Sequence, residues 1–261
     1  MTTDGVELAA PAAPEPNIPK ESKPNSFSRI AGVFFAPGET FASIVRRPDF
    51  IVPLVIIFIV SILSGILIAQ KVDFKDLARQ AIESNPRAAN LPPDVQQKQV
   101  SLMGGVMKVA AYSSPLLSIV MLAVLAAILF AAFKMFGGEG DFLQALSVTI
   151  YAWFPNLIRG IVSVVAVMAK KSLTLYSLQN PVASNFAYFI SNPRLHPMEF
   201  AFLSAIDLFT IWTMILLIIG FAAMSRFSRA KSAVIIVSLW AIKVLFSVGM
   251  GAVQALQLRA K

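Results

Sequence analysis

The stretch IVPLVIIFIVSILSGILIA, residues 51–69, decides the fold, because it is predominantly apolar and contains no charged side chain. At a rise of 1.5 Å per residue, about 20 such residues cross the hydrocarbon core of a bilayer as one helix. Four later blocks have a similar length and character: residues 114–133, 146–168, 203–224 and 233–252. The sequence therefore predicts a bundle of five transmembrane helices.

The composition supports an all-α integral membrane protein. Of the 261 residues, 57% are hydrophobic and 14% are charged, whereas soluble domains have roughly 45–50% and about 25%. The mean hydropathy is +0.72. A soluble chain of this size needs a polar surface that this composition does not supply, so the excess apolar residues must face lipid.

The rare reactive residues argue against an enzyme. The chain has no cysteine and one histidine, which removes thiolate chemistry and most imidazole-based catalysis and zinc sites. An aspartyl intramembrane protease needs two facing acids, and the predicted spans contain only Asp207. We therefore expect no catalytic residue, no metal and no cofactor.

The residues before the first span divide into two parts. Residues 1–25 are rich in Ala, Pro, Glu and Lys and predict a disordered cytoplasmic tail. Residues 26–48 show helical spacing of apolar residues, broken at Pro37, and predict two short amphipathic helices. These helices would lie in the plane of the lipid headgroups or pack on the membrane domain. Residues 49–254 form the predicted five-span domain.

The connections between spans differ in length. Residues 71–113 and 169–202 are long enough to fold, and we expect a helix from about Pro93 to Pro115 that leads into the second span. Residues 134–145 and 225–232 predict tight turns.

Basic residues beside span ends indicate the orientation. The formal net charge is +8, but the basic residues are scattered among apolar blocks, which favours an anionic membrane surface over nucleic acid. We expect the N-terminus to be cytoplasmic and the C-terminus to lie on the opposite face. If the source is prokaryotic, the membrane would be the cytoplasmic membrane. The residues expected to contact lipid headgroups are Arg46, Arg47, Arg226, Arg229 and Lys231.

Three ionisable residues fall within the predicted spans: Arg159, Asp207 and Lys243. Each costs roughly 2.5–3.5 kcal/mol at the bilayer centre on insertion scales, so each should face the protein interior and find a partner. We expect Asp207 to pair with Arg159 or Lys243. The cluster would act as a structural clamp or as an ion or proton path. Pro155 predicts a kink in the third span.

Small residues recur at a spacing of four in Ser61-x-x-x-Gly65 and Ser247-x-x-x-Gly251. Such patterns allow close helix packing. They are compatible with contacts within the bundle or with a homo-oligomer.

Several blocks resemble the Yip (Ypt-interacting protein) domain family, whose prokaryotic members have an amphipathic start followed by five spans. The opening block is Phe35-Ala-Pro-Gly-Glu-Thr-Phe-Ala-Ser-Ile44. The middle block is Gly140-Asp-Phe with Gln144, Tyr151 and Pro155, and the fourth-span block begins at Asp207-Leu-Phe-Thr-Ile-Trp212.

The resemblance implies a non-enzymatic role in organising a membrane or as a trafficking-type adaptor. Eukaryotic members are linked to Rab GTPases, but the residues before the first span lack the acidic motif of that branch, so no Rab-binding residue is carried over. The partners expected are anionic lipid and a protein at the cytoplasmic face. The alternative is a small transporter or channel subunit that uses Asp207, Arg159 and Lys243.

Overall fold

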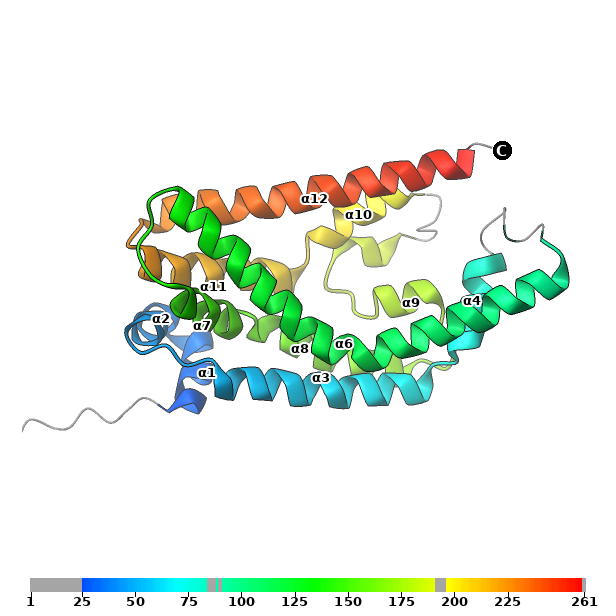
Figure 1. The fold of residues 1–261 in the computed structure, drawn as a ribbon, viewed down its shortest axis with the longest axis horizontal. Coiled ribbons are helices and arrows are strands. Elements are labelled where there is room, and N and C mark those ends of the chain that lie inside the picture. The colour runs from blue at the N-terminus through cyan, green and yellow to red at the C-terminus, as the bar shows by residue number, and fades with distance from the viewer. Residues whose placement is uncertain (1–24, 84–87, 89–90, 191–195, 260–261) are drawn as a thin grey trace, which may run out of the picture.

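The apolar blocks fold into helices, as the computed structural model shows (Figure 1). The structure describes residues 25–83, 88, 91–190 and 196–259. The predicted tail therefore lies, apart from Asn25, outside the described residues. The helices are α1 (Ser26–Phe35), α2 (Pro37–Arg46), α3 (Ile51–Lys71), α4 (Phe74–Glu83), α6 (Pro93–Met135), α7 (Phe142–Ala152), α8 (Phe154–Ala169), α9 (Leu175–Gln179), a 3₁₀ turn (Phe186–Phe189), α10 (Pro197–Ala205), α11 (Leu208–Ser225) and α12 (Arg229–Arg259).

Five helical segments in the described part of the chain are long and apolar enough to span a membrane, which confirms the predicted fold class. They are α3, α6, α7 with α8, α11, and α12. The helix expected to lead into the second span is also present, because α6 runs unbroken over 43 residues. Its length of about 64 Å is twice the thickness of a hydrocarbon core, and α4 packs on its first half.

Two predicted spans are interrupted. The third span, Phe142–Ala169, is divided at Trp153 into α7 and α8, and Pro155 lies in the first turn of α8. Proline fits that position because its missing N–H would have no partner there. The predicted start of the fourth span at residue 203 is wrong, since α10 ends at Ala205 and α11 begins at Leu208.

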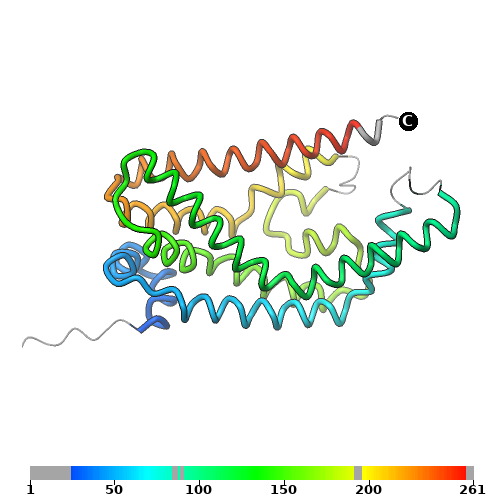
Figure 2. The backbone as a smooth tube through the Cα atoms, viewed as in Figure 1, coloured from blue at the N-terminus to red at the C-terminus, as the bar shows by residue number. Residues whose placement is uncertain are grey.

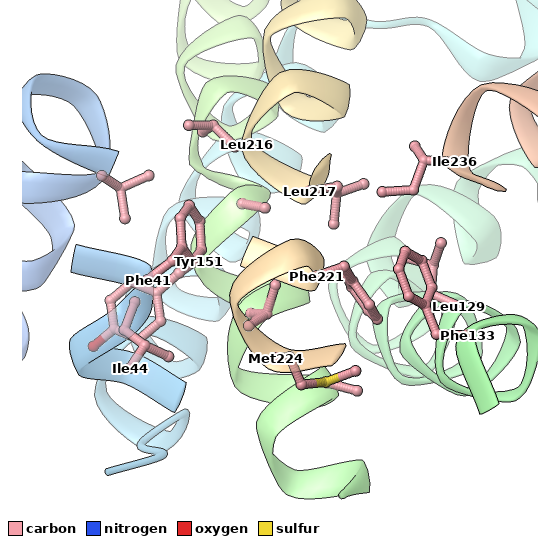
Figure 3. Close-up of a cluster of buried hydrophobic side chains, with 14 of the residues drawn as sticks. Phe41, Ile44, Leu129, Phe133, Tyr151, Leu216, Leu217, Phe221, Met224 and Ile236 are labelled. Atoms are coloured by element: carbon pink, nitrogen blue, oxygen red, sulfur yellow. The ribbon is translucent and has the colours of Figure 1, made fainter. Parts of the chain in front are cut away.

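The main core joins α1 and α2 to the long helices. Val33, Phe41 and Ile44 are fully buried and belong to the same cluster as Phe133 and Phe221 (Figure 3). The two short helices therefore pack on the bundle through one face. Their position relative to the lipid headgroups stays a prediction.

Gly220 permits the closest approach within this core. A Cβ atom at Gly220 would lie 2.4 Å from Val148 Cγ1 and 2.9 Å from Phe41 Cδ1. The absence of a side chain there lets α2, α7 and α11 meet.

The long helices run between two ends of the molecule (Figure 2). One end holds α1, α2 and the turns at residues 136–141 and 226–228, and the other holds α4, α9 and the last turns of α12. Helix α1 thus lies at one end, and α12 runs from that end to the other, where its last turns lie. Which end faces the cytoplasm stays a prediction.

Small residues bring helices together within the chain. A Cβ atom at Gly65 would lie 3.5 Å from the carbonyl oxygen of Ala111, and one at Gly251 would lie 2.8 Å from that of Pro197. Both glycines of the two small-residue patterns therefore pack inside the bundle. A homo-oligomer stays a prediction.

Candidate functional site

The residues expected to contact headgroups gather at the end that holds α1 and α2. We call this set the cationic end: Arg46, Arg47, Arg226, Arg229 and Lys231. All five are exposed. Segments far apart in sequence meet here, because Nη2 of Arg229 lies 3.5 Å from the position that a Cβ atom would take on Gly38.

Two turns are fastened to each other at this end. The backbone N–H of Glu139 donates to the carbonyl of Ser225 at 3.2 Å, and Arg226 Nε lies 2.9 Å from Glu139 Oε2. Lys231 Nζ donates to the carbonyl of Phe136 at 3.2 Å and lies 3.4 Å from the ring centroid of Phe227. These contacts hold the two cations in fixed positions at the surface.

The other three cations of the set form no ion pair with a described residue. These are Arg46, Arg47 and Arg229. Their guanidinium groups are therefore available to phosphate oxygens, which they can bind through two parallel hydrogen bonds.

A buried ion pair positions the cationic end. Arg29 on α1 is only 5% exposed and pairs with Asp49, which follows α2. The same guanidinium donates to the carbonyls of Arg47 at 2.9 Å and Ser43 at 3.1 Å. The hydroxyl of Tyr151 on α7 donates to Asp49 at 3.0 Å. This cluster fixes the end of α2 against the bundle.

Sequence reasoning missed this cluster. Arg29 and Asp49 are 20 residues apart and lie on separate segments, so no helical spacing relates them. The sequence did contain one signal: an arginine on the otherwise apolar face of a predicted amphipathic helix, beside Ile30 and Val33. A charge in that position needs a buried partner.

A second polar cluster surrounds Asp207, which is fully buried. Its Oδ1 accepts the backbone N–H groups of Phe209 at 3.0 Å and Thr210 at 3.2 Å, so it caps the N-terminus of α11. Its Oδ2 accepts from the hydroxyl of Ser184 and from Asn185 Nδ2 at 3.4 Å. Asp207 thus ties the connection after α9 to the fourth span.

The structure places Arg159 near Asp207 and leaves Lys243 elsewhere. Arg159 Nε lies 3.8 Å from Asp207 Oδ2. Lys243 is exposed on α12 and forms no ion pair with a described residue. Of the two partners considered for Asp207, Arg159 is the neighbouring one. Pro155 is buried at the start of α8.

The described residues offer no group of three His, Cys, Asp or Glu side chains that could hold a metal ion. The polar clusters at Asp49 and Asp207 each have one acid, and their oxygens are occupied by donors of the chain. They can therefore hold segments of the chain together.

Comparison with known proteins gives one match. The family described as the Yip1 domain matches residues 31–251, which covers most of the chain. No curated protein matches the sequence. No solved structure matches it either.

Proposed function

The chain belongs to the Yip1 domain family, a family of membrane proteins, and from this premise we propose that it is a non-enzymatic adaptor that organises the membrane it spans. In this proposal the cationic end binds anionic headgroups and presents α1 and α2 to a protein partner. The observation that carries it is the convergence of the five exposed cations from two stretches far apart in sequence, residues 46–47 and 226–231, at one end of the bundle.

The outward face of α1 supports contact with the membrane interface. Phe35 is 89% exposed and Phe27 is 63% exposed, although their neighbour Val33 is fully buried. Helices that combine exposed aromatic side chains with nearby cations bind at the headgroup level. The core contacts of α2 would keep the pair docked while α1 touches lipid.

The three cations that form no ion pair with a described residue determine how strongly the protein should prefer anionic lipid. A basic residue near an anionic surface gains about 1 kcal/mol. Arg46, Arg47 and Arg229 would together contribute about 3 kcal/mol, which is about a hundredfold in the preference for anionic over zwitterionic lipid.

The test is lipid enrichment around the purified protein. The protein is reconstituted in nanodiscs of mixed phosphatidylglycerol and phosphatidylcholine, and the lipid retained after extraction is counted by native mass spectrometry. The test variant replaces all five cations of the cationic end by Gln. The matched control replaces five exposed lysines elsewhere: Lys71, Lys75, Lys98, Lys108 and Lys171.

We expect the test variant to lose most of the retained phosphatidylglycerol and the control to keep it. Equal retention in the two variants would contradict the proposal. The transporter alternative has a separate test: solute flux in proteoliposomes that disappears in Asp207→Asn. The proposed adaptor predicts no such flux.

A further inference from the structure

A cavity of about 430 Å³ lies between α3, α8 and the end of α9 with Pro181 after it. This volume is in the range of pockets that bind small ligands, about 300–1,000 Å³. Its walls include the apolar side chains Ile68, Val72, Val167 and Leu178. The cavity lies away from the cationic end, because it is built from the end of α3 that leads to α4.

Most of the polar lining comes from one face of α8, and Gln179 on α9 adds a further polar side chain. Asn156, Arg159, Gly160 and Ser163 follow the spacing i, i+3, i+4 and i+7, and all four line the cavity. Residues at this spacing share a helix face. Polar residues within a membrane-spanning helix are costly unless they face the protein interior or a cavity.

The guanidinium group of Arg159 has N–H donors that are available to a ligand. Its distance of 3.8 Å to Asp207 gives an ion pair, which holds the guanidinium group, but exceeds the length of a hydrogen bond. The carboxylate is already occupied by four donors of the chain. No hydrogen bond joins Arg159 to an acceptor on a described residue, and its side chain is 32% exposed.

We propose that this cavity binds an anionic amphiphile from the membrane, with a phosphate or carboxylate head on Arg159 and an acyl chain along the apolar wall. The guanidinium fork matches both head groups. Ser163 is a further donor beside it, and Asn156 Nδ2, which donates one hydrogen to Thr213 at 2.7 Å, has a second N–H. Val72 and Val167 are already buried by the chain, but Ile68 and Leu178 are partly exposed. A free anion would leave these two side chains uncovered, whereas an acyl chain would bury them at about 25 cal/mol per Å².

Gly160 offers a direct way to fill the site. A Cβ atom at Gly160 would meet no atom within 4 Å, so a larger side chain can enter without striking the backbone. Gly160→Leu therefore blocks the cavity and keeps the Arg159–Asp207 pair. Arg159→Gln removes the charge, and Asp207 keeps its four donors.

The test is ligand retention by the full chain. Wild-type protein and the variants Arg159→Gln, Gly160→Leu and Lys243→Gln are reconstituted with phosphatidylglycerol in one arm and palmitate in a second. Bound ligand is counted by native mass spectrometry after exchange into detergent. Inorganic phosphate is added in a third arm, with the melting temperature as the readout. Lys243→Gln removes an exposed cation outside the cavity and is the matched control.

We expect wild type and Lys243→Gln to retain one amphiphile per chain, and Arg159→Gln and Gly160→Leu to retain at least tenfold less. Whether the retained ligand appears in the phospholipid arm or in the palmitate arm identifies its source. Equal retention in all four proteins would overturn the proposal. Stabilisation by inorganic phosphate without retained amphiphile would overturn it as well. The cationic end is intact in every variant, so either result is separable from the adaptor proposal.

Discussion

Removing the charge of Asp49 should loosen the junction between the short helices and the bundle. Asp49→Asn keeps the size of the side chain but only one of the two acceptor oxygens, both of which accept hydrogen bonds in the structure. It leaves Arg29, which is 5% exposed, without its opposite charge. The guanidinium keeps the carbonyl acceptors on Arg47 and Ser43.

The magnitude follows from the burial of the pair. Breaking a buried ion pair by removing one partner costs about 3–5 kcal/mol. Asp49 is 32% exposed, so solvent screens part of the interaction and the acceptors that remain recover some of it. We expect a loss of about 2–3 kcal/mol in the free energy of unfolding. In domains of 150–250 residues this corresponds to about 4–12 °C in the melting temperature.

The assay is thermal unfolding in detergent, followed by tryptophan fluorescence. The matched control is Asp76→Asn, whose partner Arg79 lies at 3.8 Å with both side chains at least half exposed. Exposed pairs contribute about 0–1 kcal/mol, so the control should unfold within about 2–4 °C of wild type. If Asp49→Asn also stays in that interval, the cluster does not anchor α2 and the reasoning is refuted.

Three further substitutions test other parts of the fold. Gly220→Ala places a methyl group 2.4 Å from Val148 Cγ1. This overpacking should lower the free energy of unfolding by about 1–3 kcal/mol, measured by thermal unfolding. An unchanged melting temperature would contradict the close packing. Arg226 has φ 57° at the end of α11, a left-handed conformation that glycine adopts without strain. Arg226→Gly should therefore raise the free energy of unfolding by up to about 1 kcal/mol, less the contribution of the lost ion pair. A decrease of more than about 1 kcal/mol would mean that the ion pair dominates. Asp207→Ala removes the cap of α11 and leaves four donors, among them the buried Asn185, without this acceptor. It should cost at least about 2 kcal/mol by the same assay, and wild-type stability would rule out the clamp.

Length and hydropathy made the five spans predictable, because an apolar run of about 20 residues has few other solutions. The positions at which the helices break were harder to predict from the sequence. Pro155 predicted a disturbance in the third span, but a proline inside a helix and one in its first turn have the same sequence signature. Asp207 was taken for a buried charge within a span, yet it is the cap that begins one.

The residues of the cationic end could be predicted, because basic residues cluster in the sequence beside the ends of the spans. Arg46, Arg47, Arg226, Arg229 and Lys231 were all named from the sequence, and the structure brings them to one end. The pairing of Arg29 with Asp49 could not be predicted from the sequence, since it depends on how the chain turns after α2. The polar face of α8 was readable from its spacing, although only its arginine was considered.

Several residues that carry the family resemblance are structural joints. Gln144 takes part in the capping box of α7 with Asp141, and its Nε2 donates to the carbonyl of Val45 at the end of α2. Tyr151 reaches Asp49, and Asp207 caps α11. Gln144 and Tyr151 thus help to place α2 on the bundle, which is the arrangement that the proposed adaptor role requires.

The most direct test of the adaptor proposal is photocrosslinking from the cationic end in native membranes. A photoreactive amino acid replaces Phe35, which is 89% exposed, in wild type, in the fivefold Gln variant of the cationic end and in the matched lysine variant. We expect crosslinks to anionic lipid and to a stoichiometric protein partner in wild type and in the matched variant, and the loss of both in the cationic-end variant. Identical crosslinks in all three proteins would contradict the proposal that this end is where the protein binds.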